Sequence, residues 1–199
     1  MAGALSASAE TPAGKTYRDY YEWNLLPKSI DLEDENVLAD FQRLVDEGEA
    51  CHEAMLAIVK ECGDSMIASY ALSVLRETRG DKKTVVEELK QFFAARFPSA
   101  EGDEEFLMTF IAETVADIGT ADDMDVLVPM LAHQNMRVRY LGASYLGQRG
   151  DQRVMEALEQ AKSRESNNLV REEIEKAISD IESRLAEQNA EEAPPASEP

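Results

Sequence analysis

Apolar positions recur along this chain with the three- and four-residue spacing of amphipathic helices, and glycines separate the successive stretches. A helix-like stretch ends at each of Gly48, Gly80, Gly119 and Gly150, which are 32, 39 and 31 residues apart, and another stretch begins just beyond each glycine. A unit of this size buries its apolar face only by stacking on its neighbours. The pattern therefore predicts an all-α protein of nine helices, with about four helical hairpins stacked in a short α-α superhelix, or solenoid.

The clearest predicted hairpin runs from Met136 to Lys162. The positions that carry the pattern are Val138, Leu141, Gly142 and Tyr145 before the turn and Val154, Ala157, Leu158 and Ala161 after it. The first helix ends at Gly150, and Asp151 is placed to cap the second. We expect these two amphipathic helices to fold against each other.

Beyond Asn167 the pattern changes to one long apolar stripe without an internal glycine. Its members are Val170, Ile174, Ala177, Ile178, Ile181 and Leu185. A single helix here would act as a C-terminal capping helix that shields the open end of the stack. The same stripe, from Leu169 to Leu185, could instead pack against a second copy of the chain, so homo-oligomerisation through this helix stays open.

Composition divides the chain into four parts. Residues 33–188 hold the helical repeats. Residues 1–16, rich in Ala, Ser and Gly, and residues 189–199, a Pro/Glu/Ala tail, are predicted to be disordered. Residues 17–32 form an aromatic-rich segment between the first of these and the repeats.

The aromatic-rich segment contains half of the six tyrosines and the only tryptophan, at Tyr17, Tyr20, Tyr21 and Trp23. These side chains could cap the exposed edge of the first hairpin. They could also dock a partner, because Tyr and Trp anchor protein interfaces well. Burial of Trp23 in the free protein would favour the cap.

The segment from Asn135 to Ile181 resembles bacterial HEAT repeats. The resemblance rests on a Val-Arg pair, an Ala, a Leu-Gly pair and a Gly-Asp turn, which here are Val138, Arg139, Ala143, Leu146, Gly147, Gly150 and Asp151. Val170 and Arg171 begin the form again without completing it. Such a resemblance implies a curved, right-handed stack whose inner helices often hold another macromolecule. HEAT-like proteins also include chromophore lyase subunits and DNA glycosylases, so the fold alone does not select a function.

The chain is strongly acidic, with a net charge of −20. Residues 31–59 hold nine acidic side chains against Arg43 alone, and residues 97–136 hold nine with no Lys or Arg. Such a surface repels nucleic acid and anionic lipid and admits a basic protein partner. Many of these carboxylates precede predicted helices, so we expect helix capping from clusters such as Asp103–Glu105 and Asp122–Asp123.

The sequence shows no residue set that identifies a reaction, and no cofactor or metal site is predicted. Cys51 and Cys62 lie too far apart on one predicted helix to form a disulfide and are expected to fill the core. His52 and His133 are not at metal-ligand spacing and are expected to be solvated or to cap helices. No apolar run is long enough to span a bilayer, and a cytoplasmic location is expected.

The leading hypothesis is a non-enzymatic protein–protein interaction scaffold that uses the second helix of each hairpin. Its candidate contacts, besides the aromatic-rich segment, are Glu49, Glu53, Asp123, Asp125 and Met130. A narrower version is an inhibitor or immunity-type protein that neutralises a basic toxin or nuclease. The alternative from another class is an enzyme or enzyme subunit, such as a HEAT-like lyase.

Overall fold

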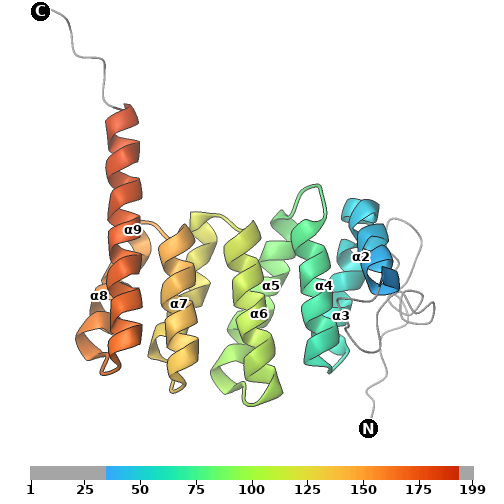
Figure 1. Ribbon diagram of the computed structural model, residues 1–199, viewed down its shortest axis with the longest axis horizontal. Helices are drawn as coiled ribbons and strands as arrows, with labels where there is room; N and C mark the ends of the chain where they lie inside the picture. The colour runs from blue at the N-terminus through green and yellow to red at the C-terminus, as the bar shows by residue number, and fades with distance from the viewer. Residues whose placement is uncertain (1–34, 193–199) are drawn as a thin grey trace, which may run out of the picture. The chain divides into compact units, whose positions relative to one another are not determined.

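A computed structural model of the protein describes residues 35–192. Within this range the chain forms eight α-helices, numbered α2 to α9, and three 3₁₀-helices, with no strand, so the predicted all-α class is confirmed (Figure 1). The predicted segments 1–16 and 17–32, and residues 193–199 of the predicted tail, lie outside the described residues. The chain divides into two compact units, one ending at Gly119 and the other starting at Thr120.

The first unit is built around α4. In chain order its elements are α2 (Glu35–Glu47), η1 (Gly48–Cys51), α3 (His52–Glu61), α4 (Ser65–Glu77), α5 (Lys83–Arg96), η2 (Phe97–Ser99) and α6 (Asp103–Ile118). Asp64 starts α4, because its Oδ1 accepts hydrogen bonds from the backbone nitrogens of Met66 and Ile67 at 2.9 and 3.2 Å. Gly48, directly after α2, has a φ of +60°, a conformation that favours glycine at a helix end.

The helices of the first unit pack mostly on their neighbours in sequence. α4 contacts α2, α3 and α6, while α5 contacts α3 and α6; α4 and α6 lie side by side in Figure 1. The largest fully buried side chains of this unit are Leu44, Met55, Ile58, Leu72, Leu75, Leu89, Phe93, Met108 and Ile111. Each contributes about 1.5–3 kcal/mol when buried, so this continuous core holds the helices together.

The second unit consists of η3 (Ala121–Ala132), α7 (Met136–Arg149), α8 (Gln152–Arg164) and α9 (Asn168–Glu192). α7 packs closely on η3 and α9, and α8 packs on the same two elements. Of the two elements that precede and follow it in the chain, α7 therefore packs on η3. The predicted hairpin instead paired α7 with α8. The reason lies in two glycines of α7: a Cβ on Gly142 would lie 2.6 Å from Met130 Cβ of η3, and one on Gly147 would lie 2.8 Å from Ala177 of α9.

The segment after Gly119 is a 3₁₀-helix, whereas its apolar pattern was expected to form an α-helix. Pro129 lies inside it and cannot donate the backbone hydrogen bond that an α-helix needs there. Met124, Leu127 and Met130, spaced by three residues, are all fully buried. This spacing matches the three residues per turn of a 3₁₀-helix. Eight of the nine predicted helices are thus α-helices, and the ninth is of the tighter type.

α9 is the predicted long C-terminal helix, and its apolar stripe is buried as far as Ile181. The stripe packs on α7 and α8, and the opposite side carries exposed polar residues such as Glu172, Glu175 and Glu182. The helix continues to Glu192, four residues beyond the predicted end of the repeat domain. A second copy could use this stripe only by displacing α7 or α8. In the described part of the chain no helix is both long and apolar enough to cross a membrane.

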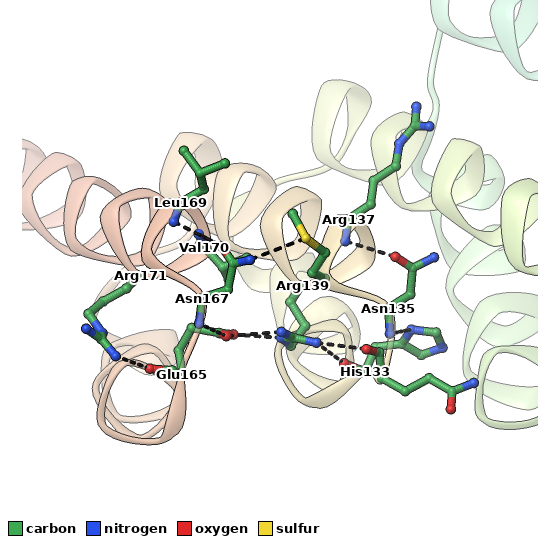
Figure 2. Close-up of polar contacts among 11 residues, drawn as sticks. His133, Asn135, Arg137, Arg139, Glu165, Asn167, Leu169, Val170 and Arg171 are labelled. Atoms are coloured by element: carbon green, nitrogen blue, oxygen red, sulfur yellow. Dashed lines mark hydrogen bonds and ion pairs between the residues drawn. The ribbon is translucent and has the colours of Figure 1, made fainter.

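The two loops that lead into α7 and α9 are built alike, 32 residues apart (Figure 2). Asn135 Oδ1 accepts from the backbone nitrogen of Arg137, and Asn167 Oδ1 accepts from those of Leu169 and Val170. In each helix an arginine side chain then donates a hydrogen bond to the backbone carbonyl of the residue six positions earlier. Arg139 Nη1 donates to His133 O at 2.8 Å, and Arg171 Nη2 donates to Glu165 O. Arg139 and Arg171, the arginines of the two Val-Arg pairs, therefore hold in place the loops that precede α7 and α9.

Candidate partner-binding groove

A groove of about 620 Å³ lies in the first unit between α3 and α5, the two helices that follow Gly48 and Gly80. It is lined by Glu49, His52, Glu53, Leu56, Ala57, Lys60, Glu61, Asp81, Thr84, Val85 and Glu88. The structure thus brings together Glu49 and Glu53, the two candidate contacts predicted for the first repeat.

The groove is acidic around an apolar floor. Five of its lining residues carry carboxylates and one, Lys60, carries an ammonium group, whose Nζ is paired with Glu88. Leu56 and Val85 on the floor are buried, so their apolar surface backs the charged rim. A Lys or Arg side chain with an apolar stem would find both a carboxylate and an apolar surface here.

Two of the carboxylates on α3 are available to a partner. Glu53 and Glu61 are exposed, and neither makes an ion pair or side-chain hydrogen bond within residues 35–192. They lie eight residues apart, which places them on the same face of α3. Glu61 was not among the contacts predicted from sequence, although its spacing of eight residues from Glu53 places it on the same helix face. Asp81, in the turn before α5, and Glu88, on α5, could be placed beside them only by the fold.

Glu49 has a structural role in addition to its place on the rim. Its Oε1 accepts a hydrogen bond from the backbone nitrogen of Asp81, and its side chain lies over Gly80. A Cβ at Gly80 would come within 2.2 Å of Glu49 Oε1, and the φ of +110° at this glycine is rarely adopted by other residues. Glu49 therefore holds the turn before α5 against the start of α3.

His52 is buried beneath the groove, and not solvated or capping as expected. Its Nε2 lies 2.8 Å from Thr78 Oγ1, which itself donates to Leu75 O at 3.0 Å. Both contacts are satisfied together when His52 donates from Nε2 and the threonine proton goes to the Leu75 carbonyl. Burial lowers the pKa of His52 below its usual value, although nearby Glu49 raises it in part. The neutral imidazole thus joins the first turn of α3 to the end of α4.

The candidate contacts in the second unit have separate roles. Asp123 forms a capping box with Thr120: its Oδ2 accepts from the backbone nitrogen and from Oγ1 of Thr120, both at 2.8 Å. Asp122 Oδ1 pairs with Arg153 at 2.5 Å, and Asp125 is exposed. Met130 is completely buried against α7. It therefore belongs to the core, and its prediction as a partner contact on the surface is corrected.

A second groove, of about 480 Å³, lies between η3 and α8. It is lined by Val128, Leu131, Ala132, His133, Arg139, Ala157, Gln160, Ala161, Arg164, Glu165 and Ser166. Its most buried charges neutralise each other, because Arg139 Nε donates to Glu165 Oε2 at 2.6 Å and Nη2 donates to Oε1 at 3.0 Å. These hydrogen bonds also hold the pKa of the Glu165 carboxyl below its usual range. With Arg139 Nη1 on two loop carbonyls, this pair offers no free acid or base.

The cysteines and His133 have structural roles or none that the described residues show. Cys51 is fully buried, as expected for a core-filling cysteine, while Cys62 is only partly buried and burial raises its pKa. His133 Nδ1 accepts from the backbone nitrogen of Asn135 at 3.1 Å, which is the cap-like role expected for it. Residues 35–192 contain no cluster of three His, Cys, Asp or Glu side chains that could hold a metal.

The aromatic candidates Tyr17, Tyr20, Tyr21 and Trp23 lie outside the described residues. Comparison of the chain with protein-family models, with characterised proteins and with solved structures finds no match.

Proposed function

We propose that this protein is a non-enzymatic interaction module of the HEAT-repeat type, and that the groove between α3 and α5 binds a basic segment of a partner protein. The observation that carries the proposal is the gathering of five carboxylates, from η1, α3, α5 and the turn before α5, around an apolar floor. Glu53 and Glu61 are the carboxylates that the fold itself does not use.

The repeat-type assignment is supported by the second unit. The 32-residue recurrence of an Asn cap followed by a Val-Arg pair is an arrangement expected of tandem repeats. Mostly sequential helix contacts within each unit point the same way. We propose that the helices within each unit stack as in a short right-handed solenoid.

The partner segment should carry Lys or Arg near small apolar residues. Exposed carboxylates interact weakly one at a time, so affinity would come from several of them acting together with the floor. Association would be faster at low salt, because the acidic rim steers a cation and salt screens that attraction.

Two double variants test this placement. Glu53→Lys with Glu61→Lys reverses the free charges of the groove, whereas Glu159→Lys with Glu182→Lys reverses two exposed carboxylates on α8 and α9. Both change the net charge of the protein by the same amount. Proteins captured from lysate by the wild type at low salt are compared with those captured by each variant.

The expected result is a basic partner that the wild type and the control retain, that the groove variant loses, and that high salt releases. The same partner should bind the purified wild type directly in a fluorescence anisotropy titration. A partner bound equally by all three proteins would place the interface elsewhere. The absence of any partner lost selectively from the groove variant would reject the proposal.

A further inference from the structure

A second groove of the first unit, between α2 and α4, is apolar where the α3–α5 groove is acidic. Its volume is about 350 Å³, and it is lined by Leu38, Phe41, Gln42, Val45, Tyr70, Ser73, Arg76 and Glu77. Leu38 is 50% exposed. Phe41 and Val45 beside it are partly exposed, so the groove presents adjoining apolar side chains of the kind that another segment can cover.

Tyr70 gives this groove an unsatisfied polar group. The residue is only 3% exposed, its ring packs edge-on against Phe41 at a centroid distance of 5.6 Å, and burial raises its pKa to about 12. Within the described residues its hydroxyl has no hydrogen-bond partner. A buried hydroxyl without a partner is costly, so this group calls for an acceptor or donor in the groove.

The chain itself supplies a segment of matching chemistry close by. Glu35, the first residue of α2, is twelve positions after Trp23, and this stretch spans at most about 40 Å when extended. α2 has 13 residues and is about 20 Å long, so either end of the groove is within reach. A tethered segment binds at a high effective concentration, which favours it over an equivalent segment in another molecule.

We propose that residues 17–26, with Tyr17, Tyr20, Tyr21, Trp23, Leu25 and Leu26, lie in the groove between α2 and α4 of the same chain. Their apolar side chains cover Leu38 and Phe41, and a polar group of the segment pairs with the Tyr70 hydroxyl. This assignment uses a different surface from the acidic groove and does not depend on the proposed function.

Trp23 is the only tryptophan, so its fluorescence reports on this segment alone. In the full chain we expect blue-shifted emission and protection from acrylamide, both independent of protein concentration. Leu38→Glu should shift the emission toward that of tryptophan in water and increase quenching. Ser73→Arg, which fills the groove from α4, should have the same effect, and circular dichroism checks that both variants keep their helices.

The matched control is Leu169→Glu, which places the same charge at a leucine that is 61% exposed in the second unit. It should leave Trp23 emission unchanged. Water-like emission of Trp23 in the wild type would overturn the proposal, and so would protection that survives both groove variants. Protection that appears only as concentration rises would assign the groove to a second copy and would also overturn it.

Discussion

Arg139 and Glu165, 26 residues apart, are joined at two points across the second unit (Figure 2). The Glu165 side chain is 5% exposed, and its Oε1 also accepts from the backbone nitrogen of Asn167 at 2.8 Å. Because Arg139 also contacts the carbonyls of His133 and Gln134, one guanidinium connects the loop before α7 to the loop before α9. This pair therefore fixes how the starts of α7 and α9 are spaced.

Removal of Arg139 should destabilise the protein by about 3 kcal/mol, because it leaves the buried Glu165 carboxylate without its partner. Urea denaturation of Arg139→Ala measures the loss. Arg139→Lys should recover little of it, since one ammonium cannot replace a two-point contact. Arg137→Ala is the control: this neighbouring arginine is exposed, and its loss should change stability by less than about 0.5 kcal/mol. Equal effects at the two positions would contradict the role given to the pair.

Gly147→Ala should destabilise the second unit, although alanine favours helices over glycine by about 0.5–1 kcal/mol. The new Cβ would lie 2.8 Å from both Cα and Cβ of Ala177 on α9. Such overpacking typically costs about 1–3 kcal/mol, so the steric effect should outweigh the helix preference.

A double-mutant cycle with Ala177→Gly isolates this contact. In that background the substitution at Gly147 should cost less, because one of the two close atoms is gone. The melting temperatures of the four proteins give the coupling. Strictly additive effects would show that α7 and α9 are not pressed together at this point.

His52 predicts a pH dependence of stability. Its pKa is lowered in the folded protein by burial, so below the ordinary value of 6.5 the unfolded chain binds the proton more readily than the folded one. Stability should be fully present above that value and fall as pH drops through the region below it. His52→Gln keeps a donor for Thr78 and should flatten this part of the profile. Denaturation curves of both proteins over the same pH series provide the measurement, and parallel profiles would contradict it.

Asp123 and Asp125 should differ sharply despite their proximity in sequence. Asp123→Ala removes the capping box of η3 and should cost about 1 kcal/mol. Asp125→Ala removes an exposed carboxylate and should change stability by less than about 0.5 kcal/mol. Thermal denaturation of both variants tests this; a larger loss at Asp125 would show that the cap has been misassigned.

The sequence predicts well those features that depend on short-range chemistry. The helix end before Gly150 and the cap at Asp151, whose side chain accepts from the backbone nitrogen of Arg153, are both confirmed. The burial of the Val170 stripe follows from its periodicity in the same way. These signals lie within one or two turns of the residues that they control, so no knowledge of the tertiary fold is needed.

Features that depend on distant partners could not be predicted. Nothing near His52 indicates Thr78, 26 residues away, so its burial was missed. Met130 was expected on the surface, because a period of 3.6 fits its neighbours almost as well as the period of three that buries it. Glu53 was predicted as a partner contact from sequence. Asp81 and Glu88 line the same groove only because α5 lies beside α3.

The two matching loops of the second unit also make the length of the protein adjustable by design. A duplicate of residues 135–166 inserted after Ser166 would put Asn135 where Asn167 stands, and Val138 and Arg139 where Val170 and Arg171 stand. Each new junction would then reuse the ion pair between Arg139 and Glu165, and the original α9 would still close the array. The loop contacts would be kept, whereas Tyr145 and Arg149 of the duplicate would stand where Ala177 and Ile181 are buried, so these two positions would need small and apolar replacements for the added helices to pack.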